Sequence, residues 1–329
     1  MSGSGRALLK RIMSVAYTHQ PSDLPDVFIH STQRSGSTLL FDAIASRKGM
    51  KAVGEPLQER KRHAISRYIQ EPRSRYFSLD STVHERLHAY LDDLLSGSFV
   101  GGFERSYSIR NPRHHFFTNR NAVKILRTFA CSDRIAEMYP GAKHIALVRH
   151  PVPTVLSRLR NGWSAPIEEF LIDPGLIEIL TREQHRLLLR LARSKPLDRH
   201  VAVWLVEHFG VRRKVRTLQE LHVPIVALEH IVVDPPAAAE WLSQTLHIND
   251  RQGIEHRLGL PSRSTRHSTK ETTQALSEGK ASETLSRWTE LVDAGTKESV
   301  AAGLSLFDID FYDVNVTEPR GALAASPWE

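Results

Sequence analysis

The chain has 329 residues, of which 40% are hydrophobic and 25% are charged, as expected for a folded globular protein and not for a disordered one. Its 44 Lys and Arg outnumber its 37 Asp and Glu. The net charge of +7 favours an anionic partner such as nucleic acid, anionic lipid or a phosphate-bearing cofactor. The single cysteine, Cys131, excludes an internal disulfide framework and a cysteine-rich zinc site.

No segment has the length of a membrane span, and the apolar stretch Ile12 to Ala16 is too short for a signal peptide. We therefore expect a cytoplasmic protein without stable membrane insertion. No internal repeat or long low-complexity linker divides the chain. We expect an N-terminal arm at residues 1–25, one domain at residues 26–315 and a C-terminal tail at residues 316–329. No exposed heptad repeat indicates an oligomeric state, which stays open.

Short apolar runs alternate with amphipathic stretches along the chain. Strands that alternate with helices form a parallel sheet with helices on both faces, so we expect a P-loop-like three-layer α/β fold. In such sheets ligands bind beyond the carboxyl ends of the strands. In chain order the pattern predicts a strand at residues 27–31, a helix at 37–44, a helix at 83–95, a strand at 122–126, a helix at 133–139, a strand at 144–148, a helix from 151, a strand at 223–228, a helix at 237–246 and a loop-rich polar stretch at 262–280.

A candidate anion-binding loop lies between the first strand and the first helix, at residues 31–38. Unpaired backbone N–H groups and the helix dipole favour an anion at this position. Gly36 lets the backbone approach a ligand, and Arg34 can hold two oxygen atoms through its planar guanidinium. Ser35, Ser37 and Thr38 add hydroxyl groups. The alternative is a Ser/Thr helix cap beside a surface arginine.

A second strand leads into a helix through Arg149 and Pro151. Ser157 follows Arg149 by eight positions, about two helical turns, so its hydroxyl can point back toward the end of the strand. The two side chains can then share one phosphate. Taken singly, both are also common as ordinary surface residues.

Together these loops resemble those of sulfotransferases that use 3′-phosphoadenosine 5′-phosphosulfate (PAPS). Residues 33–40 are similar to the loop that binds the 5′-phosphosulfate, in particular in trehalose and N-acetylglucosamine-6-O sulfotransferases, which also carry arginine there. Residues 149–157 resemble the family's 3′-phosphate motif, R-x-P-x-x-x-x-x-S. Residues 123–127, which include Lys124, are similar to the strand that precedes this motif.

The resemblance extends less closely to the C-terminal part, and in all it spans Val27 to Tyr312. Residues 228–235 resemble the family's segment Y-E-D-L-x-x-D-P, with Leu228 in place of the Tyr and His230 in place of the Asp. Residues 265–270 and the helix around Trp288 are similar to the C-terminus of carbohydrate sulfotransferases.

The resemblance implies a PAPS-dependent enzyme that transfers a sulfuryl group in line to a hydroxyl acceptor and releases PAP, without a metal. Carbohydrate, glycolipid and small-metabolite acceptors stay open. The phosphosulfate would contact residues 34–38 and the 3′-phosphate would contact Arg149 and Ser157. Lys124, Arg263, Arg266 and Lys270 are further candidates for donor binding or plain surface charges.

The acceptor hydroxyl requires a general base. The resemblance places a glutamate soon after the phosphosulfate helix, and here Glu55 lies at such a position. Glu59 lies one turn away, and His114 or His115 precedes the Lys124 strand, so these bases also stay open. Glu55 can instead be a surface carboxylate that pairs with Lys51 or Arg62.

Two other function classes compete with the sulfotransferase interpretation. A P-loop kinase would show G-x-x-x-x-G-K-[ST], whereas this loop has one glycine and carries Arg34. A non-enzymatic binder of polyanions would show basic runs with interleaved aromatic residues. The short runs 60–63 and 212–214 fit solvated helix faces as well, so we expect no nucleic acid partner.

Overall fold

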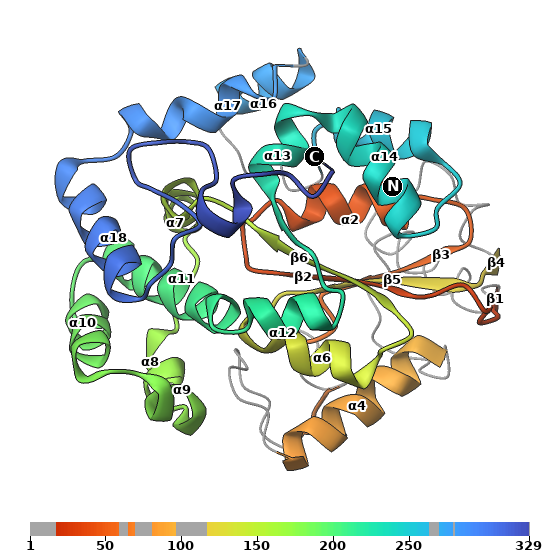
Figure 1. Cartoon of the computed structure of the whole chain (residues 1–329), viewed down its shortest axis with the longest axis horizontal. Coiled ribbons are helices and arrows are strands. Elements are labelled where there is room, and N and C mark those ends of the chain that lie inside the picture. Colours follow the sequence, from red (N-terminus) through yellow and green to blue (C-terminus); the bar gives the residue numbers. More distant parts are fainter. Residues whose placement is uncertain are drawn as a thin grey trace, which may run out of the picture.

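The computed structural model describes residues 18–58, 65–69, 81–96, 117–262, 270–278 and 280–328. Its centre is a five-stranded parallel sheet in the order β3-β5-β2-β6-β7 (Figure 1). β2 is the middle strand. A small second sheet pairs β1 with β4. The strands are β1 (Thr18–His19), β2 (Val27–Ser31), β3 (Met50–Gly54), β4 (Phe117–Thr118), β5 (Arg120–Ile125), β6 (Lys143–Val148) and β7 (Ile225–Ala227).

Alternate residues of β2 face two different hydrophobic cores, because side chains point to opposite faces along a strand. Val27 and Ile29 pack with the helices on one face, and Phe28 packs with those on the other. The first face carries α2 (Ser37–Ala45), α13 (Leu228–Val233), α14 (Pro235–Thr245) and α15 (Arg251–Leu258). The second carries α4 (Ser81–Ser96) and α6 (Ser132–Met138), on the opposite side of the sheet in Figure 1.

A third and larger core lies beside the sheet, around the long helix α11 (Pro196–Arg212). α11 is buried almost all round and packs against α7 (Pro151–Arg160), α10 (Arg182–Ala192) and α18 (Ala294–Leu306). The chain passes from the carboxyl end of β6 directly into α7, so this core lies next to the carboxyl ends of the strands (Figure 1). The remaining helices are η2 (Phe129–Cys131), α8 (Ile167–Leu171), α9 (Pro174–Ile179), α12 (Val215–Glu220), α16 (Lys270–Ser277), α17 (Glu283–Ser286), η4 (Arg287–Glu290) and η5 (Gly321–Leu323).

The three-layer α/β prediction is confirmed, and the predicted strands and helices are present with ends shifted by a few residues. Two segments differ. The strand expected at 223–228 ends at Ala227, because Leu228 begins α13 and packs over Gly36. Part of the stretch expected as loop forms α16, which starts at Lys270 and buries Ala275.

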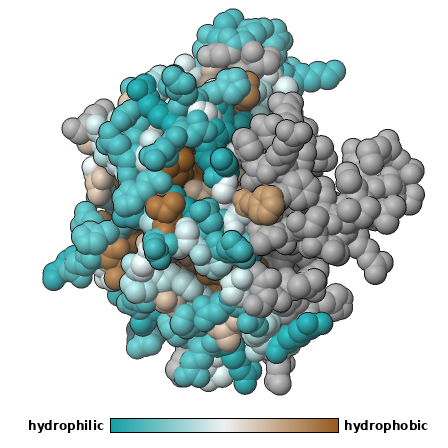
Figure 2. All heavy atoms as spheres, turned by 90° about the vertical axis from the view of Figure 1, so that its right-hand side faces the viewer, coloured by the Kyte–Doolittle hydropathy of each residue, from teal (hydrophilic) through white to brown (hydrophobic). Residues whose placement is uncertain are grey.

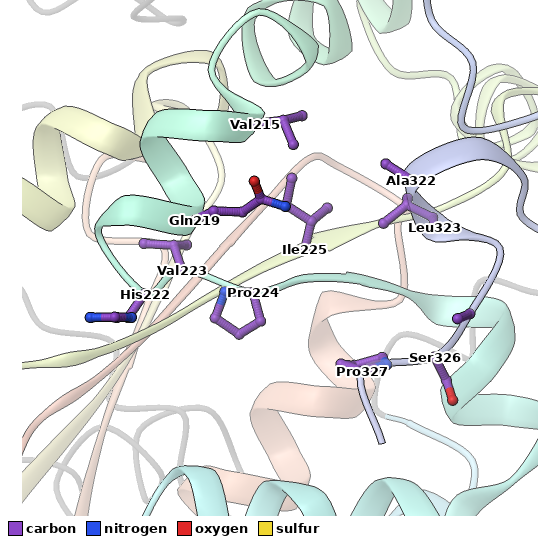
Figure 3. A pocket seen from close by; sticks show the side chains of 11 residues that line it. Val215, Gln219, His222, Val223, Pro224, Ile225, Ala322, Leu323, Ser326 and Pro327 are labelled. Carbon is purple, nitrogen blue, oxygen red and sulfur yellow. The ribbon is translucent and has the colours of Figure 1, made fainter. Parts of the chain in front are cut away.

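The C-terminal segment, expected as a tail, packs on the protein. Leu323 is buried beside β7, and the segment lines a pocket of about 460 Å³ together with Gln219 and Pro224 (Figure 3). The domain limits remain a prediction. None of the helices in the described ranges is long and apolar enough to cross a bilayer. On the face shown in Figure 2 the coloured residues are mainly hydrophilic, with apolar side chains in small separate groups.

Several histidines are buried as neutral side chains. His30 Nε2 lies 3.0 Å from His144 Nδ1 inside the core, and burial lowers the pKa of both rings. Burial also lowers the pKa of His150 to about 4 and that of His208, stacked on Trp204, to about 3. Below pH 6.5 these four histidines therefore bind more protons in the unfolded chain than in the folded protein.

We predict that the free energy of unfolding is flat above about pH 6.5 and falls as the pH drops from about 6.5 toward 4. His208→Asn removes one buried ring and should make the fall shallower in urea unfolding measured at several pH values. His222→Asn, at an exposed position, is the control and should keep the wild-type slope. Equal stability at pH 7 and pH 4.5 would contradict the prediction.

Candidate active site at the carboxyl ends of the strands

The sheet brings the predicted site residues to one edge. Gly54 of β3 is paired with Lys124 of β5, and Ser31 of β2 with Leu147 of β6. The four strands therefore end at nearly the same position along the strand direction. The residues that follow these ends therefore lie beside one another across the edge. They include Glu55 after β3, the anion loop 32–36 after β2 and Arg149 after β6.

The anion loop needs glycine at position 36. Gly36 has φ 85° and is the N-cap of α2, which has no side-chain cap. A Cβ atom at Gly36 would lie 2.5 Å from the Leu228 side chain. Leu39 N–H donates to Gly36 O at 2.8 Å, so the N–H groups of Ser37 and Thr38 are the ones that α2 can present to a ligand, at a position where the backbone can be approached closely.

The hydroxyl groups of the loop have different surroundings. Ser35 is buried and its Oγ donates to the Thr32 carbonyl at 2.7 Å, so this hydroxyl helps to shape the loop. Ser31 Oγ donates to Leu147 O at 2.7 Å and ties the loop to β6. Thr38 Oγ1 accepts a hydrogen bond from Lys124 Nζ at 3.3 Å, and Ser37 is buried at the first position of α2.

Arg34 joins the two motifs that the sequence placed in separate loops. Its Nε donates to Ser157 Oγ at 2.8 Å, and its guanidinium lies 5.6 Å from the centre of the Trp163 ring. Its backbone has φ 66°, a left-handed conformation that is uncommon for a residue with a side chain. Burial, with Arg149 and Arg160 nearby, lowers the pKa of Arg34 to about 10, so the side chain stays charged at neutral pH.

Arg149 contacts the loop rather than Ser157. Its Nη1 donates to the Arg34 carbonyl at 3.0 Å, and its Nε is buried without a partner among the described residues. Burial lowers the pKa of Arg149, while the nearby Glu229 and Tyr312 oppose this shift. Arg149 therefore keeps donor capacity that a ligand can use.

The segment after β7 supports the turn at Arg149. Glu229 is buried and accepts hydrogen bonds from His150 N at 3.0 Å and from Tyr312 Oη at 2.9 Å. Burial raises the pKa of Glu229. The His150 ring accepts from Val152 N, donates to Asp313 O and stacks on Trp288 at 4.4 Å between ring centres. The start of α7 is thus held from three parts of the chain.

Glu55 forms an ion pair with Lys124, a partner that the sequence analysis did not name. Glu55 Oε1 lies 2.8 Å from Lys124 Nζ, and Lys51 Nζ donates to Leu94 O. Lys124, which can also be read as a surface charge, is buried. Glu55 has φ 50°, so the two predicted catalytic residues, Arg34 and Glu55, both adopt left-handed backbone conformations.

Of the other candidates, only Lys270 lies in the part of the chain that the structure describes. Lys270 is exposed at the first position of α16. In the described part of the chain, no three His, Cys, Asp or Glu side chains form a group that could hold a metal. Glu59, Arg62, His114, His115, Arg263 and Arg266 lie outside the described residues.

Sequence reasoning missed three residues at the site. Trp163 contacts Arg34 from the loop after α7. Arg158 donates from Nε to Gln33 O at 3.1 Å, and its Nη2 pairs with Glu207 at 2.8 Å. One signal was available for Glu207: it is an acidic residue inside the apolar stretch 201–211 of α11. An acid buried in such a helix needs a cationic partner.

Residues 25–204, more than half of the chain, match the sequence profile of the sulfotransferase family. The chain belongs to this family. The matched region holds the anion loop and Arg149, so the enzyme is a sulfotransferase. No curated protein matches its sequence.

Three solved structures are similar to this sulfotransferase over most of their length. They are the sulfotransferase domain from the Synechococcus PCC 7002 olefin synthase (17% identity, 90% of this chain and 97% of that chain covered, TM-score 0.43), mouse sulfotransferase SULT7A1 complexed with PAP (11%, 90% and 88%, TM-score 0.41) and the sulfotransferase domain from the curacin biosynthetic pathway (16%, 86% and 99%, TM-score 0.40).

We predict that Gly36→Ala lowers the free energy of unfolding by about 1–3 kcal/mol, because it combines a strained backbone with a clash against Leu228. Adding Leu228→Ala removes the clash, so the double variant should lose less than the two single changes summed. The matched control is Gly141→Ala, where a Cβ meets nothing within 4 Å. A Gly36→Ala protein as stable as Gly141→Ala in urea would refute the argument.

Proposed function

We propose that this sulfotransferase transfers a sulfuryl group from PAPS to the hydroxyl of a carbohydrate, glycolipid or small metabolite and releases PAP. The observation that carries the proposal is the 2.8 Å bond between Arg34 and Ser157, since it brings two anion-binding motifs of different strands into one site. The resemblance of both motifs to PAPS-binding loops supports the choice of donor.

The donor would use groups that are charged or have spare hydrogen-bonding capacity. Arg149 Nε and Thr32 Oγ1 are buried and have no partner within the described ranges. Arg149 and Arg160 each repel Arg34, so an anion beside Arg34 is favoured. We place the 3′-phosphate near Arg149 and Ser157, and the phosphosulfate at residues 34–38 with Lys124 on its other side.

In the proposed reaction the acceptor oxygen attacks sulfur in line. Glu55 takes the proton of the acceptor hydroxyl, and the bond between sulfur and the phosphate oxygen breaks with its electron pair left on PAP. Lys124, Arg34 and the N–H groups of α2 would stabilise the negative charge that develops on the leaving phosphate. Arg34 reaches the phosphosulfate by exchanging its bond to Ser157 for one to the donor.

The pair of Glu55 and Lys124 gives the site two charged groups with different tasks. In the structure the ammonium neutralises the carboxylate at 2.8 Å. When the phosphosulfate binds, its oxygens compete for Lys124 and release Glu55 toward the acceptor. Glu59, His114 and His115 remain alternative bases, and transfer without a metal remains a prediction.

Trp163 supports an acceptor that carries a ring. Its side chain contacts Arg34 and stays 38% exposed, so part of its ring faces solvent next to the reacting groups. Exposed aromatic rings bury apolar area at low entropic cost. A sugar ring or an aromatic alcohol stacked there would place its hydroxyl near Arg34, which favours a ring-bearing acceptor over an open-chain one.

We predict that PAP binds in isothermal titration and that ATP with magnesium binds at least about 10-fold more weakly. Arg34→Ala and Arg149→Ala should each weaken PAP binding about 10- to 100-fold, because each removes a charge-assisted hydrogen bond. Arg216→Ala is the control, since Arg216 is 91% exposed and pairs with Glu220 of its own helix.

Preference for ATP would favour a P-loop kinase over a sulfotransferase site that uses PAPS. Binding of neither nucleotide would favour a polyanion binder. Unchanged PAP affinity in both arginine variants would refute the placement of the donor.

We predict that Glu55→Gln keeps PAP affinity within about 2-fold and lowers kcat by about 100-fold or more, because general base catalysis contributes on this scale. The assay follows transfer from labelled PAPS to a panel containing trehalose, N-acetylglucosamine and 4-nitrophenol. Glu137→Gln, on the exposed surface of α6, is the control and should leave turnover unchanged. Wild-type turnover in Glu55→Gln would contradict this role and assign general base catalysis to Glu59, His114 or His115.

A further inference from the structure

Two successive carbonyl groups of the anion loop are held by arginines of the segment that follows β6. Gln33 O accepts from Arg158 Nε at 3.1 Å, and Arg34 O accepts from Arg149 Nη1 at 3.0 Å. In a trans peptide the N–H points away from the C=O of the same unit, and no described peptide is cis. The N–H groups of Arg34 and Ser35 therefore point away from these arginines.

Arg158 is an unusual side chain for this position, because it is only 1% exposed and charged. Its Nη2 lies 2.8 Å from Glu207 Oε2, and Glu207 is 2% exposed on α11. Removing two charges from water is costly, and an apolar pair of similar volume would stabilise the fold as well or better. Packing alone does not explain the pair.

We propose that Arg158 and Glu207 are positioning residues for donor binding, an inference that rests on the proposed function. Glu207 fixes the guanidinium from the rigid helix α11, and the planar fork then presents Nε to the Gln33 carbonyl. This contact holds the peptide between Gln33 and Arg34 in the orientation that turns its N–H toward the anion.

Helix α7, which carries Arg158, makes a second contact with the anion loop. Ser157 and Arg158 are neighbours on α7, and they contact Arg34 Nε and Gln33 O respectively. α7 thus reaches both the side chain and the backbone of the anion loop. A shift of α7 relative to α11 would disturb both contacts together.

Two variants separate positioning from stability. Arg158→Lys keeps a cation for Glu207 but removes the Nε–H group that Gln33 O accepts. The double variant Arg158→Met with Glu207→Met removes the ion pair, and its melting temperature should equal or exceed that of the wild type. We expect both to bind PAP about 10-fold more weakly in titrations below their melting temperatures. Asp133→Asn, which breaks the Lys214 ion pair away from the loop, is the control and should keep PAP affinity.

Nuclear magnetic resonance of the Arg34 and Ser35 amides gives a readout that needs no ligand, because these N–H groups belong to the peptide units whose carbonyls accept from Arg158 and Arg149. The amide chemical shifts of Arg34 should change in Arg158→Lys and stay unchanged in Asp133→Asn. Wild-type PAP affinity and wild-type amide shifts in Arg158→Lys would overturn the inference, and this variant decides if the double variant does not fold. If the wild type itself fails to bind PAP, the proposed function fails, and the amide shifts still decide whether the pair positions the loop.

Discussion

Crowding of positive charge beyond the carboxyl end of β2 is the constraint on which the rest of the site depends. Arg34 lies near Arg149 and Arg160 and contacts a hydroxyl and an aromatic ring, Ser157 and Trp163, rather than a carboxylate. Three further cations of this edge have a carboxylate close by: Glu229 lies near Arg149, Glu207 pairs with Arg158 and Glu55 pairs with Lys124. The excess of positive charge is therefore concentrated around Arg34 and Arg160, where an anion is stabilised most.

Holding such a cluster requires rigid supports, because like charges would otherwise move apart. The central strand supplies one, since β2 pairs with β5 and β6 on its two sides. The turn into α7 supplies another, through the buried carboxylate of Glu229. The left-handed backbone at Arg34 and Glu55 is kept by these surroundings, and both residues sit where chemistry is proposed. The strained backbone conformations and the positive charges thus lie at the same edge of the sheet.

The part of the chain that follows the family match supplies buried contacts to the candidate site. The match ends at residue 204, yet Glu207, Glu229 and Tyr312 lie beyond it and contact the turn or its supports. Trp288 and Asp313 fix the His150 ring at the start of α7. A fragment cut after the matched region would lose these buried partners and leave Arg158 as an uncompensated charge.

The sequence by itself determined the alternation of strands and helices, the anion loop around Gly36 and the second motif with Arg149 and Ser157, because each depends on residues close together along the chain. It also supplied Glu55 as a candidate base. Only the tertiary structure decided that Arg34 bonds to Ser157, that Lys124 pairs with Glu55 and that Glu207 lies behind the loop. Those contacts join residues that are far apart in sequence. They depend on strand order and helix packing, which no local sequence pattern encodes.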